Sequence, residues 1–257
     1  MPFLCYYIDY TTLLGSFQRI ILNWKGFLTL IYITGDTHGD IKRFKSRAAK
    51  KLTKNDILIV CGDFGFMWDD SEEEQKKIDF LNQQKYQILF VDGTHENFDK
   101  IENQPVVDLY SAKAHRITRN IYHLIRGEIY NIDGKFLFAF GGGVSPDLEQ
   151  LLDRGTWSER EMPTEDEMRY AVENLKKVNC EVDYIVTHEA NATHKHKIWR
   201  NCKTNPVNLF LEQLCAEVRY KKWFFGNLHA DFALSDSVFS VFEEIVPIDE
   251  IRKSRNF

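Results

Sequence analysis

Short runs of apolar, β-branched and aromatic residues alternate along the chain with longer polar stretches that have the period of a helix. The short runs predict strands, namely Leu30–Thr34, Ile57–Cys61, Ile88–Val91, Phe136–Phe140, Tyr184–Thr187, Trp223–Phe225 and Val238–Phe242. The polar stretches predict helices over residues 40–52, 71–84, 165–177 and 206–219. Because strands and helices alternate, the sequence predicts an α/β fold built on largely buried sheets.

Capping signals mark where several of these helices begin. Ser71 is followed by Glu74, and Thr164 by Glu167, which are capping-box patterns. Pro206 suits the first turn of a helix. Between the predicted strands and helices, Gly141 to Pro163 is expected to be a long loop, the kind of segment in which substrate-facing variation is common.

The first 29 residues lack this alternation, since the first convincing strand begins at Leu30. We therefore assign residues 1–29 to an N-terminal extension of uncertain structure and residues 30–257 to one domain. A chain of 257 residues fits one large or two small domains at about 150 residues per domain.

Composition and charge narrow the class of protein. Hydrophobic residues make up 44% and charged residues 28%, which is typical of a globular protein. The net charge of −5 gives no basic excess of the kind that nucleic-acid binding needs. The 5 cysteines form no C-x-x-C pair, so we expect neither a disulfide framework nor a zinc ribbon. No run reaches the roughly 18 apolar residues of a membrane span, and we predict a cytoplasmic location.

Acidic and histidine side chains follow five of the predicted strands. The segments are Gly35-Asp36-Thr37-His38, Gly62-Asp63, Asp92-Gly93-Thr94-His95-Glu96, Thr187-His188 and Gly226-Asn227-Leu228-His229. A single Asp or His after a strand is usually a turn or core residue. Ligands of α/β sheets, however, bind at the carboxyl ends of strands, so five strand ends that each carry an Asp or a His indicate one shared site. A mixture of Asp and His favours Mn²⁺, Fe²⁺ or Zn²⁺, and a carboxylate such as Asp63 can bridge two ions.

The order of these motifs resembles the calcineurin-like metallophosphoesterases, whose pattern is D-x-H, G-D, G-N-H-[DE], a lone H and G-H-x-H. The resemblance covers about Leu30 to Phe242, and the residues around the motifs resemble those of a bacterial and prophage branch of the family. It implies two mixed β-sheets packed face to face with flanking helices, a four-layer αββα sandwich.

The resemblance also implies a role for each matching residue. It implies a first metal ion held by Asp36, His38, Asp63 and His229, and a second ion bound by His188 and bridged by Asp63. His95 matches the histidine that contacts the phosphate and protonates the leaving oxygen. That role suits imidazole, which can supply a proton near neutral pH.

Two positions depart from the pattern, and both concern the second ion. Thr94 stands in place of the family's asparagine, and Asn227 in place of its first G-H-x-H histidine. A threonine hydroxyl is a poor ligand, and an asparagine oxygen suits harder ions better than zinc. Asn97 is an alternative ligand. The second ion could bind weakly together with substrate phosphate, the enzyme could act slowly with one ion, or catalysis could be lost.

The predicted function is therefore a phosphoesterase that uses up to two divalent ions to cleave a phosphate mono- or diester. The alternative is a weak or inactive binding protein of the same family. Other enzyme motifs are incomplete, since Ser145 lacks a G-x-S-x-G context and Ala192 interrupts H-E-x-x-H. Arg126 is interpreted as a surface arginine, and contact with the substrate phosphate is the alternative. The sequence does not identify the substrate or the oligomeric state.

Overall fold

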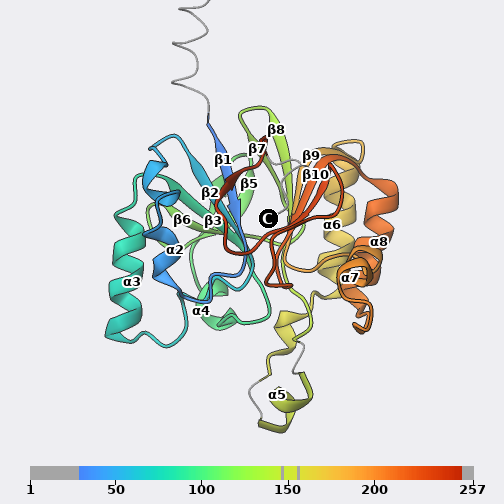
Figure 1. Ribbon diagram of the computed structural model, residues 1–257, viewed down its shortest axis with the longest axis horizontal. Coiled ribbons are helices and arrows are strands. Elements are labelled where there is room, and N and C mark those ends of the chain that lie inside the picture. Colours follow the sequence, from blue (N-terminus) through green and yellow to red (C-terminus); the bar gives the residue numbers. More distant parts are fainter. Residues whose placement is uncertain (1–28, 146–147, 155–156, 251–257) are drawn as a thin grey trace, which may run out of the picture.

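The computed structural model describes residues 29–145, 148–154 and 157–250, which form two mixed β-sheets with helices on their outer sides (Figure 1). The first sheet has the strand order β13 (Val246–Pro247), β1 (Ile31–Thr34), β2 (Ile57–Cys61), β3 (Gln87–Val91), β6 (Ile121–Leu124), β5 (Ala112–Arg116) and β4 (Val106–Leu109). The second has the order β11 (Phe232–Ala233), β12 (Val238–Ser240), β10 (Arg219–Phe225), β9 (Glu181–Thr187), β8 (Lys135–Phe140) and β7 (Ile129–Ile132). The predicted fold class is confirmed.

Alternating side chains of the strands explain why the sheets face each other. In β2, Ile57, Ile59 and Cys61 lie in a core shared with residues of the second sheet, such as Val186. The other residues of β2, Leu58 and Val60, lie in a separate core beneath the helices of the first sheet. Because successive side chains of a strand point to opposite faces, a strand buried on both faces reads as a continuous apolar run.

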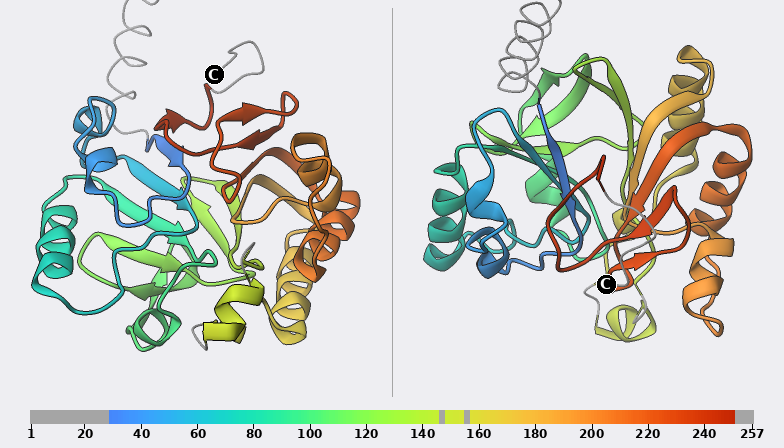
Figure 2. Two further views of the ribbon diagram at one scale, coloured as in Figure 1. Left: turned by 60° about the horizontal axis from the view of Figure 1, so that its bottom comes forward. Right: turned by 45° about the horizontal axis from the view of Figure 1, so that its top comes forward.

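The helices cover the outer faces of the two sheets. Figure 2 shows the blue and cyan helices outside one sheet and the yellow and orange helices outside the other. They are α2 (Ile41–Phe44), α3 (Glu72–Asn82), α4 (Phe98–Glu102), α6 (Glu165–Lys177), α7 (Ala192–Ile198) and α8 (Pro206–Glu217), whereas α5 (Leu148–Arg154) lies away from the sheets (Figure 1). The Ser71 and Thr164 hydroxyls accept hydrogen bonds from the Glu74 and Glu167 amides, so the predicted starts of α3 and α6 are confirmed. No helix in the described residues is long and apolar enough to cross a membrane.

The predicted helix over residues 40–52 is wrong. The chain instead forms α2 and a 3₁₀ turn, Ala49–Lys51. The Ser46 hydroxyl accepts a hydrogen bond from the Ala49 amide at 3.1 Å, which offers the backbone an alternative to continuous helix.

Several short elements were not predicted. The strands β4 and β5 have partly exposed, polar positions, so they do not read as buried apolar runs. The expected long loop after Gly141 contains α5, which projects from the sheets (Figure 1), and a 3₁₀ turn, Glu159–Glu161. Apart from Thr29, the predicted N-terminal extension lies outside the described residues.

Candidate metal centre

The candidate residues meet where loops from the two sheets come together. Asp36, Asp63 and His95 follow the first-sheet strands β1, β2 and β3, whereas His188 and His229 follow β9 and β10 of the second sheet. Two sets of three residues each offer ligand atoms that all lie within 4.8 Å of one another. One set is His38, Asp63 and His95, and the other is Asp36, Asp63 and His229.

Asp63 lies at the centre of this cluster and is 3% exposed. Its Oδ1 accepts hydrogen bonds from the Thr94 amide at 2.7 Å and the His95 amide at 2.8 Å. Its Oδ2 lies 3.2 Å from Nδ1 of His95 and 3.6 Å from Nε2 of His38. Burial acts to raise the pKa of Asp63, but the charge of His188 and the hydrogen bonds from His95 lower it well below its usual range. The carboxylate is therefore ionised and available to cations.

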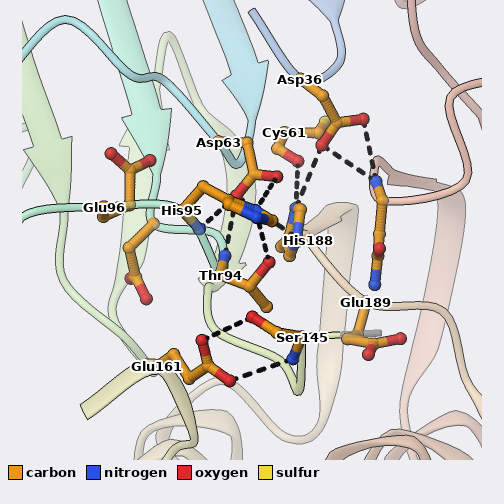
Figure 3. Close-up of polar contacts among 12 residues, drawn as sticks. Asp36, Cys61, Asp63, Thr94, His95, Glu96, Ser145, Glu161, His188 and Glu189 are labelled. Carbon is orange, nitrogen blue, oxygen red and sulfur yellow. Dashed lines mark hydrogen bonds and ion pairs between the residues drawn. The ribbon is translucent and has the colours of Figure 1, made fainter. Parts of the chain in front are cut away.

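His188 is fully buried between two carboxylates (Figure 3). Its Nδ1 lies 3.1 Å from the Cys61 carbonyl oxygen and 3.3 Å from Oδ1 of Asp36. Its Nε2 has no hydrogen-bond partner among the described residues and lies 3.7 Å from Oδ1 of Asp63. Burial acts to lower the pKa of His188, but Asp63 and Asp36 raise it to about 10. The surroundings therefore favour positive charge here, and a divalent cation on Nε2 would supply both a partner and that charge.

Asp36 and the two remaining histidines complete the cluster. Both oxygens of Asp36 accept a hydrogen bond from the Asn227 amide, at 3.0 and 2.9 Å. Nε2 of His229 lies 2.9 Å from Nε2 of His38. Burial lowers the pKa of His38, which favours the neutral imidazole that a metal ion requires. These residues fit the donor set of a divalent ion.

Four residues of the cluster have a left-handed backbone. The φ angles are 44° at His38, 44° at Asp63, 65° at Asn227 and 46° at His229. A positive φ is uncommon outside glycine and costs about 1–3 kcal/mol where the surrounding structure enforces it. Such residues cluster at functional sites, so the strain supports a functional role for these loops.

The glycine before Asp63 is required by the buried histidine. Gly62 has a φ of +94°, and a Cβ there would lie 2.0 Å from Nδ1 of His188. We expect Gly62→Ala to lower the free energy of unfolding by about 2–4 kcal/mol, measured by urea denaturation. Gly134→Ala is the matched control, since Gly134 has a φ of +81° and open space around it. Its expected cost is about 1 kcal/mol. Equal losses in the two variants would contradict the proposed clash.

The residues at the two departures lie at the cluster but have other contacts. The Thr94 hydroxyl lies 3.1 Å from Nδ1 of His95. Asn227 contacts Asp36 through its backbone amide. The side chain of Asn97 caps α4, accepting from the Lys100 amide at 3.2 Å and donating to the Trp68 carbonyl at 2.7 Å. Because both polar atoms of Asn97 are engaged, the structure does not favour Asn97 as a substitute ligand.

Sequence reasoning missed a buried ion pair beside the cluster. Arg126 is 7% exposed, so its interpretation as a surface arginine is wrong. Its guanidinium donates to Asp92 from Nε at 2.9 Å and from Nη2 at 2.5 Å. Burial acts to raise the pKa of Asp92, but the Arg126 charge lowers it well below its usual range. The position of Asp92 at the end of β3 was the available signal, but its partner is 34 residues away along the chain.

Buried glutamates bond to the surrounding loops, and Figure 3 shows the contacts of one of them, Glu161, with Ser145. Glu96 accepts from the Phe64 amide at 2.6 Å, next to Asp63, and burial raises its pKa to about 8. Glu161 accepts from the Ser145 hydroxyl at 2.8 Å, and Glu189 pairs with Lys195 at 3.1 Å. None of these partners follows from a local motif.

Comparison with known proteins agrees with this geometry. Residues 29–231 match the family described as calcineurin-like phosphoesterase, a range that includes every candidate residue from Asp36 to His229. None of the curated proteins matches the chain. The family is one of phosphoester hydrolases that typically bind divalent metals. Since the match covers most of the sequence, the chain belongs to the calcineurin-like phosphoesterase family.

Proposed function

We propose that residues 30–257 form a metal-dependent phosphoesterase domain that cleaves a phosphate mono- or diester. The observation that carries the proposal is the buried Nε2 of His188, which lacks a hydrogen-bond partner and lies beside the ionised carboxylate of Asp63. A bacterial or prophage branch of the family, a cytoplasmic location and a substrate other than long nucleic acid are further parts of the proposal. The net charge of −5 supports the last of these.

Two groups of residues would hold the ions, which we propose are Mn²⁺, Fe²⁺ or Zn²⁺. The first group is Asp36, His38, Asp63 and His229. The second is Asp63 and His188, with Asn227 as a weaker oxygen ligand. Ions bound here would polarise the phosphoryl oxygens and lower the pKa of a water molecule. The distances of 3.6 Å from Asp63 to His38 and 3.7 Å from Asp63 to His188 support Asp63 as the shared ligand.

His95 is the proposed proton donor to the leaving-group oxygen. Its side chain is 43% exposed, so substrate can reach it. Oδ2 of Asp63 and the Thr94 hydroxyl both lie near Nδ1, at 3.2 and 3.1 Å, and hold the ring in one orientation. A positioned imidazole of this kind typically contributes a factor of about 10²–10⁴ to the rate.

The alternative function is phosphate or metal binding with little or no catalysis. The Thr94 hydroxyl beside His95 favours it, because this side chain offers the second ion less than an asparagine oxygen would. Metal analysis of the purified protein, with hydrolysis of p-nitrophenyl phosphate and its bis-ester in Mn²⁺, Ni²⁺ and Mg²⁺, separates the two functions. Hydrolysis of either ester supports the phosphoesterase, whereas a bound ion with no hydrolysis supports the alternative.

The double variant Thr94→Asn with Asn227→His tests whether the second ion limits the rate. We expect kcat to rise about 10- to 100-fold with saturating Mn²⁺, because two stronger ligands are supplied. The control carries the same substitutions at the exposed positions Thr53 and Asn201. An unchanged kcat from a measurable wild-type rate would show that the second ion is not limiting.

A further inference from the structure

Phe242, just beyond β12, packs its ring against a candidate metal ligand. The rings of Phe242 and His229 are stacked, with centroids 4.7 Å apart and an interplanar angle of 14°. The Arg43 guanidinium carbon lies 5.0 Å from the centroid of the same phenyl ring, a cation–π distance. Phe242 therefore connects His229 to a cationic side chain of α2.

The backbone of Phe242 joins two of the three loops that carry the first group of ligands, the loop after β1 and the loop after β10. Its carbonyl oxygen accepts hydrogen bonds from the Gly35 amide at 3.0 Å, from the Thr34 hydroxyl at 2.8 Å and from Arg43. Its amide donates to Oδ1 of Asp231 at 2.7 Å. Gly35 immediately precedes Asp36, and Asp231 lies two residues after His229. The backbone of Phe242, from which the phenyl ring extends, is thus bonded to both loops.

The His229 ring contacts two other rings, those of His38 and Phe242. It lies in a loop between β10 and β11, is exposed, and has a φ of 46°. An exposed side chain on a loop samples several rotamers, and fixing one of them costs free energy when the ligand binds. A stacked aromatic ring restricts these rotamers before binding, as outer partners of metal-bound histidines commonly do.

We infer that Phe242, backed by Arg43, is a positioning residue that orients the His229 imidazole for metal binding. The inference rests on the proposed function, because it takes His229 as a ligand. Phe242 touches neither substrate nor ion in this role. Its effect is to raise the affinity of the first ion by preorganising one of its four ligands.

Calorimetric titration of metal-stripped protein with Mn²⁺ tests this role. We expect Phe242→Leu to weaken the affinity of the first ion about tenfold, because the side chain stays apolar but loses its stacking face. Phe242→Tyr keeps the ring and should bind within about twofold of the wild type. Phe232→Leu is the matched control, since Phe232 is 50% exposed and lies three residues after His229. It should bind Mn²⁺ as the wild type does.

A second measurement separates positioning from a structural role. Thermal unfolding of each variant with and without Mn²⁺ should show that Phe242→Leu reduces the stabilisation by metal, beyond any change in the metal-free protein. Wild-type affinity in Phe242→Leu, with binding lost in His229→Ala, would overturn the inference and leave the proposed function intact. Unchanged binding in His229→Ala would instead overturn the ligand assignment and this inference together.

Discussion

Asp63→Asn is expected to lower kcat/KM for p-nitrophenyl phosphate by at least about 1,000-fold. The Asp63 carboxylate belongs to both proposed groups of ligands, and it lies within 3.7 Å of His38, His95 and His188. An asparagine oxygen can still accept the Thr94 and His95 amides, so the loop keeps its shape while the site loses one negative charge. A 1,000-fold loss corresponds to about 4 kcal/mol of transition-state stabilisation, within the range of metal catalysis. Steady-state kinetics and metal analysis of the purified variant measure both effects.

The control for this variant is at the other end of the same strand. Asp56 precedes β2, is 5% exposed and accepts a hydrogen bond from the Thr53 amide at 2.5 Å. Asp56→Asn therefore removes a buried charge without touching the metal centre, and we expect its activity to stay within about threefold of the wild type. Asp63→Asn with more than a tenth of wild-type activity would refute the bridging role.

His95→Gln is expected to produce the second large effect, which should depend on the leaving group. For an alkyl phosphate monoester, kcat should fall by about 10²–10⁴-fold, because an alkoxide must be protonated as it leaves. For p-nitrophenyl phosphate the loss should be smaller, since p-nitrophenolate is stable without a proton. The metal content should stay unchanged. Comparing kcat for the two esters in the wild type and the variant measures this difference.

His196→Gln provides the matched control, because His196 is an exposed histidine on α7, outside the candidate cluster. It should leave both rates at wild-type values. Equal losses on the two esters, or loss of metal from His95→Gln, would show that His95 acts as a ligand or in binding and not as a proton donor.

The central architecture could be predicted because its strands are buried on both faces. Such strands, of which β2 is an example, are continuous apolar runs, and the polar residues that end them mark one edge of each sheet. The strands β4 and β5 escaped prediction because exposed, polar positions interrupt their apolar pattern. After α2, the Ser46 hydroxyl accepts a hydrogen bond from the Ala49 amide, a local contact that hydrophobic periodicity does not register.

At the candidate site, the sequence predicted the residues at the strand ends but not the contacts that position them. That Asp36, Asp63, His188 and His229 lie together follows from their positions after parallel strands. The contact of Arg126 with Asp92, and that of Phe242 with His229, joins residues distant in the chain. These contacts depend on how the loops pack, and a single sequence carries no periodic signal for them.

The candidate ligands come from both sheets, so the geometry of the candidate metal centre depends on how the two sheets pack. Asp36, His38 and Asp63 follow strands of one sheet, and His188 and His229 follow strands of the other. A sliding of one sheet past the other by a single ångström would alter several ligand distances at once. The apolar interior between the sheets thus helps to set the geometry of the candidate metal centre.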